Sequence, residues 1–431
     1  MKKKKLLVKI VFVAFVVLLL FSLVAPAIFS QARLPAPQKE NLLNGLKVLM
    51  WPDAKSDKVS VRIRVHSGSA FDPQGREGVM YLLANNVFPN DAAKDYFADD
   101  LGGGLEIITT YDYIEINASA KPDGMLSMLE TLSTAVANPV IDKETTGRLR
   151  DALLAKLKES EAEPGYLADQ AAAKRLLGTF PYGRPLLGTP ESVKNINFAD
   201  LIDAKERFLT ADNATIALSG NFDRPLAYRA VRRYFGGWLK SDKRVPSTFT
   251  NPEEPPASLL TIRSPKPGVA AIRFAIRGTS RSDKELSASF IFSSILETRL
   301  KARVPSIHSE DVFVRNEPHT LPGLIMIGFS ADRSTVGDAN GKIEANDLLF
   351  KALSDTITDA EFQIARNKVR SEWEKRDAVT AWLDADTYKL SDPNRDAASM
   401  SSATLAGVRA FQEKMTKSPV AVVLVNSPPA A

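Results

Sequence analysis

The sequence predicts an α+β protein with two similar domains, each a mainly antiparallel sheet with helices packed on one face. Three observations support this prediction. A length of 431 residues is too great for one ordinary hydrophobic core and suits two domains. Short alternating runs typical of β-strands occur together with longer runs of helical periodicity. Residues 59–69 and 269–279 also share one pattern, a strand that runs into Gly-Ser or Gly-Thr.

In the first half, the predicted elements are short β runs and amphipathic helices. A proline bounds both long helices, because proline cannot continue a helix. In chain order these elements are two β runs within 46–70, a helix at about 78–87, a strand at 114–118, helices through 125–136 and at about 142–161, and a closing strand at 214–219.

The second half follows a similar order with little sequence identity. Its predicted elements are strands at 269–279 and 420–425, a polar surface loop at 339–344 and a charged helix at 361–375. A stretch that contains Pro246, Pro252, Pro255 and Pro256 separates the halves. We therefore predict an N-terminal domain at 45–244, a linker at 245–258 and a C-terminal domain at 259–428.

The first 32 residues predict export. A lysine cluster precedes an apolar run from Ile10 to Ala25, which is long for a signal peptide and short of the roughly 20 residues that span a membrane. Residues 30–32 (Ser-Gln-Ala) suit a signal peptidase. We expect either a cleaved signal peptide or an inner-membrane anchor at 6–27, followed by a tether at 33–44. In both cases the folded part lies in the periplasm or another extracytoplasmic space.

Charge and cysteine content exclude several function classes. The net charge is +5, and five lysines lie in the first 32 residues, so the rest of the chain is balanced. We therefore expect no nucleic-acid partner. The chain has no cysteine, which excludes thiol catalysis, disulfides and cysteine-ligated metals.

Segments along most of the chain resemble the insulinase-like (M16) metallopeptidases, in the order of that family. Residues 76–89 resemble the helix that carries the family's zinc motif, H-x-x-E-H. The other similar segments are 44–48 with 51–53, 65–70, 101–105 with 109–113, 181–185 with 187–192, and 213–215 with 219–223. The resemblance implies two M16-type α+β domains.

The zinc-motif positions hold residues that do not suit zinc. By the resemblance, the motif falls on Tyr81, Ala84 and Asn85. Catalytic zinc needs nitrogen or carboxylate ligands and a carboxylate that activates water. A further zinc-binding Glu of the family aligns with Lys156, whose positive charge would disfavour a cation, although Lys156 also suits a solvated helix face. We therefore expect no zinc and no other cofactor.

Other catalytic arrangements lack support in the sequence. His66, His308 and His319 are scattered, with no i,i+4 pair, so we expect no histidine-based metal site. The G-x-S-x-G motif of serine hydrolases is absent, and adjacent residues such as His66 and Ser67 point to opposite faces of a strand. Residues 102–104 (Gly-Gly-Gly) lack the Lys-Ser/Thr of a phosphate loop and suit a tight turn.

The resemblance also implies two peptide-binding elements. Active relatives hold a peptide by adding it to the edge of one strand. Here the corresponding residues are Glu106, Ile107, Ile108, Thr109 and Thr110. They form either such an edge or an ordinary strand covered by its neighbours. Active relatives also position substrate with an Arg and a Tyr. Arg303 matches the Arg but no Tyr follows it, so Arg303 is either a positioning residue or a solvated arginine.

The sequence therefore predicts an exported, non-catalytic protein of M16 type that serves as a structural or peptide-binding subunit. The expected partners are a zinc-bearing M16 peptidase subunit or a second copy of the chain, an extended peptide, and the membrane if the leader is retained. Two alternatives remain open from the sequence. One is a metalloendopeptidase with non-standard ligands, and the other is a stand-alone binding or scaffold protein of the cell envelope.

Overall fold

The computed structural model describes residues 34–241, 249–266, 269–303, 312–332 and 339–426. The predicted leader and His308 lie outside these residues. Within the described ranges, no helix combines the length and the apolar character needed to cross a membrane.

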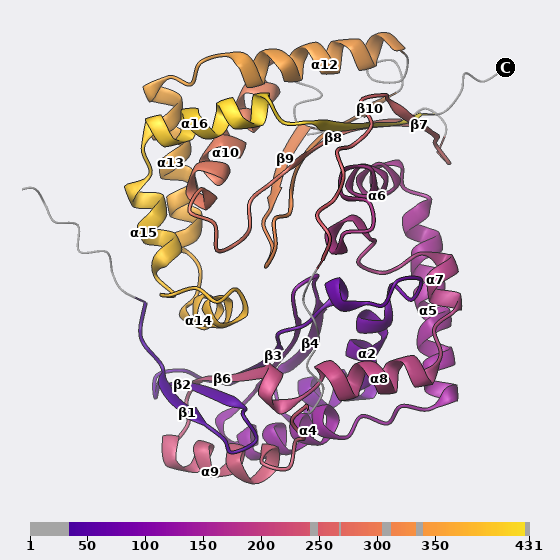
Figure 1. The fold of residues 1–431 in the computed structure, drawn as a ribbon. Helices are drawn as coiled ribbons and strands as arrows, with labels where there is room; N and C mark the ends of the chain where they lie inside the picture. The colour runs from indigo at the N-terminus through magenta and orange to yellow at the C-terminus, as the bar shows by residue number, and fades with distance from the viewer. Residues whose placement is uncertain (1–33, 242–248, 267–268, 304–311, 333–338, 427–431) are drawn as a thin grey trace, which may run out of the picture. The chain divides into compact units, whose positions relative to one another are not determined.

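The first half of the chain builds a six-stranded sheet, sheet A (Figure 1). In spatial order its strands are β1 (Gln38–Asn41), β2 (Lys47–Pro52), β6 (Ala214–Gly220), β3 (Val59–Val65), β5 (Ile114–Ala120) and β4 (Gly104–Thr109). Neighbouring strands are antiparallel except β2 and β6. Strand β4 lies at one edge and pairs only with β5 among the described strands.

Helices cover one face of sheet A and bury the main core of this half. Besides short 3-10 turns, the described helical elements of the first half are α2 (Val79–Val87), α3 (Ala92–Asp95), the π-helical turn η2 (Tyr96–Asp100), α4 (Met125–Ala137), α5 (Lys143–Glu161), α6 (Pro164–Leu177), α7 (Pro190–Lys194), α8 (Phe198–Phe208) and α9 (Arg224–Phe235). In α4, Met128, Leu129, Leu132 and Val136 are fully buried, as their helical spacing predicts. Asp142 begins α5 by accepting a hydrogen bond from the Thr145 backbone N–H.

The second half builds a five-stranded sheet, sheet B, with the same connectivity. Its strands in spatial order are β7 (Leu260–Arg263), β11 (Val420–Asn426), β8 (Val269–Arg277), β10 (Leu324–Asp332) and β9 (Val312–Glu317). Its helices are α10 (Leu286–Arg303), α12 (Ala339–Ser354), α13 (Asp359–Glu374), α14 (Ala378–Thr387), α15 (Arg395–Ser402) and α16 (Leu405–Thr416).

The two sheets share one strand order. Leaving out β1, the five remaining strands of sheet A lie in the spatial order β2-β6-β3-β5-β4, so the last strand in the chain lies beside the first. The five strands of sheet B follow the same order, β7-β11-β8-β10-β9. In both sheets the closing strand pairs parallel with the first of these strands. The predicted α+β class with two similar sheets is confirmed. The predicted surface loop at 339–344 is wrong, because these residues lie within α12.

Each sheet receives a helix from the other half on its second face. Helix α6, from the first half, packs on sheet B against β8 and β11 and buries Ala168, Ala172 and Leu176. Helix α14, from the second half, packs on sheet A, where Leu383 joins Leu49 and Ala217 in a small apolar cluster. Each half therefore uses one helix of the other half to bury apolar residues on the second face of its sheet.

Candidate functional site

Helix α2 carries the positions that resemble the zinc motif, and its start is fixed by a buried aspartate. Asp72 accepts hydrogen bonds from the backbone N–H groups of Gly78 and Met80, both at 2.8 Å. Burial raises the pKa of Asp72 to about 7, although these hydrogen bonds favour the charged form. Gly78 has a φ of 106°, in the left-handed region that favours glycine, so the entry into α2 depends on this residue.

The three motif positions lie together on α2, and none supplies a zinc ligand. Tyr81 and Asn85 are half-buried and Ala84 is buried. The Asn85 side-chain amide donates to the Tyr81 backbone carbonyl at 2.8 Å, so it serves its own helix. A phenol, a methyl group and an amide do not form the donor set that catalytic zinc requires.

Helix α5 places Lys156 directly against this face. Its ammonium Nζ lies 3.1 Å from the Tyr81 hydroxyl and 5.1 Å from the centre of the Tyr81 ring. The position aligned with the family's further zinc ligand therefore does face the motif helix. It presents a cation there, which opposes a metal ion electrostatically. Among the described residues, no group of three or more His, Cys, Asp or Glu side chains is arranged to hold a metal.

The edge strand β4 lies beside α2 and presents main-chain groups. The Thr110 N–H donates to the Tyr113 carbonyl at 2.9 Å, which makes these two residues a hydrogen-bonded pair of the β4–β5 hairpin. Such pairs alternate along an antiparallel ladder. With the observed register, Leu105, Ile107 and Thr109 therefore direct their N–H and C=O groups away from β5, toward the edge. This geometry is the one needed to add an extended peptide.

A hollow of about 420 Å³ lies between β4, α2 and α5. Leu105, Glu106 and Ile107 line it from the strand, and Asn85 and Arg148 line it from the helices. Arg148 also donates to the Pro89 backbone carbonyl at 2.7 Å, which ties α5 to the end of α2. The hollow thus joins the motif helix to the open strand edge.

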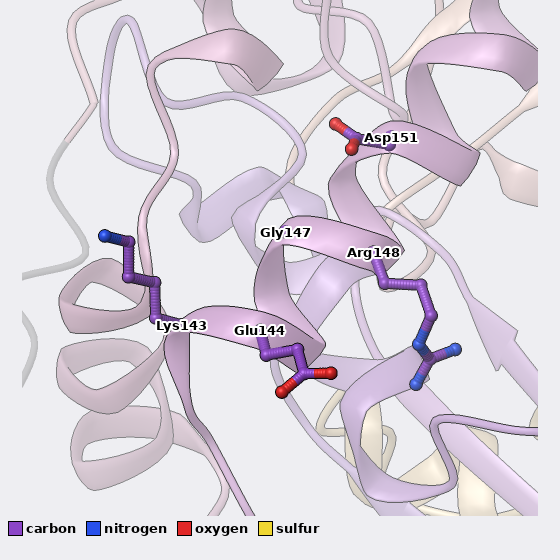
Figure 2. A pocket seen from close by; sticks show the side chains of 5 residues that line it. All are labelled: Lys143, Glu144, Gly147, Arg148 and Asp151. Carbon is purple, nitrogen blue, oxygen red and sulfur yellow. The ribbon is translucent and has the colours of Figure 1, made fainter.

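A second hollow, of about 660 Å³, lies along the start of α5 (Figure 2). Lys143, Glu144, Gly147, Arg148 and Asp151 line it. Arg148 belongs to both hollows, so they adjoin through this side chain. Charged side chains of both signs line this second hollow.

Arg303 forms its hydrogen bonds and ion pair within the second half of the described structure. At the end of α10, its guanidinium pairs with Asp355 at 2.5 Å and donates to the Arg299 carbonyl at 3.0 Å. These bonds anchor Arg303 near the end of α12. The structure does not bring it to the hollow at α2 through any bond of the described residues.

The two described histidines hold the halves together. His66, on the first half, accepts or donates at 3.0 Å to Thr387 and lies 3.1 Å from the Asp386 carboxylate. Burial lowers the pKa of His66 despite this carboxylate. His319 contacts the Asp112 carboxylate at 2.8 Å. Both imidazoles are used in structural contacts.

Two further residues on α2 and α5 were not singled out by the sequence. Arg148 joins the hollows described above. Asn86 is a polar residue on the buried side of α2, 1% exposed, next to the half-buried Asn85. The sequence shows Asn86 only as a polar residue within an apolar helical stripe. Whether such a residue is buried depends on which elements pack against α2.

The fold described above is a two-sheet α+β arrangement in which both sheets share one strand order. Two models of one peptidase family match consecutive parts of the chain: the insulinase (peptidase family M16) model matches residues 47–190, and the peptidase M16 inactive domain model matches residues 195–369. The chain belongs to peptidase family M16.

Curated relatives are distant. A probable mitochondrial-processing peptidase subunit beta of Arabidopsis thaliana is 23% identical over 364 residues, which cover 78% of this chain and 67% of the relative. An uncharacterized zinc protease of Mycobacterium leprae is 23% identical over 77% of each chain. Several other matches, such as a zinc protease of Rickettsia bellii, cover only about half of either protein (47% and 50%).

Solved structures share the fold. A peptidase M16 inactive domain from Pseudomonas fluorescens has a TM-score of 0.79 and 20% identity, and the match covers 92% of this chain and 99% of that one. A chain from complex III of Candida albicans has a TM-score of 0.69 and 17% identity, with coverage of 90% and 95%. At these identities the similarity shows the fold alone.

Proposed function

We propose that this chain is an exported, non-catalytic M16 protein that binds an extended peptide and works as a subunit beside a zinc-bearing M16 peptidase. The lack of catalysis is inferred from the residues at the positions that resemble the zinc site. These are Tyr81, Ala84, Asn85 and Lys156, and none supplies a ligand that suits catalytic zinc. The apolar leader supports export. The edge of β4 and the hollow beside it support peptide binding.

The names of two similar proteins support the proposed partnership with a peptidase subunit. One matching relative is named as a subunit of a processing peptidase, and one matching structure is a chain of complex III. A chain that keeps the fold and lacks the ligands suits a supporting subunit. Co-purification from the native source tests this step. Recovery of a partner with an intact H-x-x-E-H motif supports it, and recovery of the chain alone favours a stand-alone binding protein.

Restoring the ligands is expected to restore zinc binding. The combined variant Tyr81→His, Ala84→Glu, Asn85→His and Lys156→Glu places the family's donors on α2 and α5, where Lys156 already faces position 81. We expect it to hold about one zinc ion per chain after dialysis, measured by elemental analysis, while the natural chain holds none.

The control for this prediction retains Lys156 and carries the three substitutions on α2. It should bind zinc more weakly, because an ammonium group remains beside the metal position. Stoichiometric zinc in the natural chain, or chelator-sensitive cleavage of an unfolded peptide by it, would contradict the proposed lack of catalysis.

Blocking the β4 edge is expected to weaken peptide binding. The N–H of Ile107 faces the edge, and proline at this position removes that donor. We expect Ile107→Pro to weaken the affinity for a labelled, valine- and threonine-rich peptide by about tenfold, measured by fluorescence anisotropy. Ile107→Ala is the matched control, because it shortens the side chain and keeps the N–H. Equal affinity of the two variants would place peptide binding elsewhere.

A further inference from the structure

Helix α9 of the first half has two different faces. One face packs in the core through its buried residues, which are Ala227, Ala230, Val231 and Phe235. The opposite face is exposed and carries Arg229, Arg232 and Arg233. With 3.6 residues per turn, these three arginines lie within one arc of the helix about 100° wide. The exposed face of α9 is therefore strongly basic.

The positive charge of this face is not used in ion pairs of the fold. Arg224, at the start of α9, pairs with Glu40 at 2.6 Å. Among the described residues, the other three arginines of α9 form no such pair. Residues 224–240 contain five basic residues and no acidic residue. A concentration of one sign of charge attracts a partner of the opposite sign.

Two acidic residues close to α9 in the fold have other partners. Asp223 precedes the helix and accepts a hydrogen bond from the Leu226 backbone N–H at 2.8 Å. Asp212 accepts from the Ser241 backbone N–H at 2.9 Å. These carboxylates therefore serve backbone groups at the two ends of the segment, and the exposed arginines remain available to an anionic partner.

Two exposed leucines lie near the end of α9. Leu43 is fully exposed and Leu239 is 76% exposed. The Asn44 side chain donates to the backbone carbonyls of Phe235 and Trp238, both at 2.8 Å, so the β1–β2 turn is held beside the end of α9 (Figure 1). Single exposed leucines are ordinary. A basic helix face with exposed leucines beside it is typical of surfaces that lie on a membrane.

The predicted leader would bring a lipid bilayer within reach of this surface. Retained as an anchor, it ends at residue 27, and seven residues lead from there to Leu34. A chain of that length spans at most about 25 Å. The Trp51 indole donates to the Pro35 carbonyl at 2.9 Å, which fixes the start of the described chain at the β1–β2 hairpin. The same hairpin contacts α9, as the bonds of Asn44 show.

We propose that α9 and the β1–β2 turn form a docking surface for an anionic phospholipid bilayer. Arg229, Arg232 and Arg233 contact lipid phosphates, and Leu43 and Leu239 enter the headgroup region. An acidic protein would also attract the arginines, but the leader places lipid within reach. The inference goes beyond the proposed function, because it depends neither on peptide binding nor on the lack of zinc.

A fluorescent label placed beside Leu239 tests the inference on the full-length chain. The chain has no cysteine, so one introduced thiol carries a single label. Gly237→Cys suits this purpose, because a β-carbon at this position meets no other atom within 4 Å. Ile364→Cys, at a 71% exposed position on α13, is the control site. The label is nitrobenzoxadiazole, whose emission rises and shifts to shorter wavelength when it enters lipid.

Vesicles of equal parts phosphatidylglycerol and phosphatidylcholine are compared with vesicles of phosphatidylcholine alone. At about 0.1 M salt, we expect the label at position 237 to respond to the anionic vesicles much more strongly than to the neutral ones. At about 1 M salt the difference should disappear, because salt screens the attraction between exposed charges. The label at position 364 should respond to neither. An apolar leader inserts into both kinds of vesicle, so it does not produce this difference.

Neutralising the basic face is expected to release it from the bilayer. Replacing Arg229, Arg232 and Arg233 by glutamine should lower the ratio of docked to undocked chains roughly 100-fold, because each arginine near an anionic surface contributes about fivefold. The melting temperature should stay unchanged, because these side chains are exposed.

A charge-matched variant provides the control. It replaces three exposed lysines of the second half by glutamine, at Lys351, Lys375 and Lys417. This variant loses the same net charge and should dock as the natural chain does. Equal losses in the two variants would mean that net charge alone, without a defined surface, draws the chain to the vesicles.

Three further results would overturn the inference. One is a label at position 237 that responds equally to both kinds of vesicle, and another is a response that survives the arginine substitutions. The third is a label that responds to polyglutamate but not to anionic vesicles, which would indicate an acidic protein partner. Peptide binding at β4 and zinc content are measured separately, so their outcomes do not depend on this one.

Discussion

Replacing Asp384 by alanine is expected to reduce the free energy of unfolding by roughly 3–5 kcal/mol, the usual cost of breaking a buried ion pair. Asp384 lies on α14 and is 5% exposed. Its carboxylate contacts the guanidinium groups of Arg64 at 2.8 Å, Arg281 at 3.2 Å and Arg376 at 2.9 Å. A typical protein has only about 5–15 kcal/mol of stability, so this loss is large.

The size of the effect follows from what remains after the substitution. Arg64 and Arg281 are themselves buried, with side chains 2% and 5% exposed. Burial opposes the charge of Arg64, but the carboxylates of Glu115 and Asp384 outweigh it and raise the pKa of the guanidinium. Without Asp384, the buried arginines lose a shared counter-ion, and a buried cation without full compensation is costly.

Urea unfolding measures this loss, and an exposed pair provides the control. Asp203 is 52% exposed and pairs with Arg207 one helical turn away at 3.2 Å. We expect Asp203→Ala to cost only about 0.3–0.5 kcal/mol. Similar losses for the two variants would show that the Asp384 contacts contribute little to the stability of the fold.

Truncating Leu176 to alanine is expected to cost roughly 2–5 kcal/mol, the range for removing a buried leucine side chain. Leu176 is 1% exposed on α6, in the apolar cluster that also contains Ala271 and Ala275 of β8 and Val423 of β11. Helix α6 belongs to the first half by sequence, whereas these strands belong to sheet B. A cavity here therefore weakens the attachment of one half to the other.

Both the shape and the midpoint of the urea unfolding curve test this interpretation. Because each sheet is completed by a helix from the other half, we expect the Leu176→Ala variant to unfold in one transition, shifted to lower urea concentration. Leu226→Ala, at a partly exposed position, should change the stability by no more than about 0.5 kcal/mol. Two separate transitions would mean that the halves unfold independently.

Much of the fold was predictable because it depends on local periodicity. Strand β3 begins and ends where its alternation begins and ends, and α2 begins within a residue of the predicted helix. The start of α12 was predicted as a loop because its residues are polar, and the structure shows that they belong to a long helix. Polarity indicates which residues suit solvent, and a helix face can meet that condition as well as a loop.

The candidate site, like the fold, was predictable only in part. The loss of zinc ligands at positions 81, 84 and 85 was an inference from residue types at a known spacing. The sequence did not establish whether residue 156 faces them, and the contact between Lys156 and Tyr81 decides that point.

By itself, the sequence determined the α+β class and the placement of most predicted strands and helices. The tertiary structure alone decided that α6 and α14 complete the sheets of opposite halves and that Asp384 joins three arginines. The physical reason is that periodicity specifies which face of an element is buried. It does not specify which distant element buries that face.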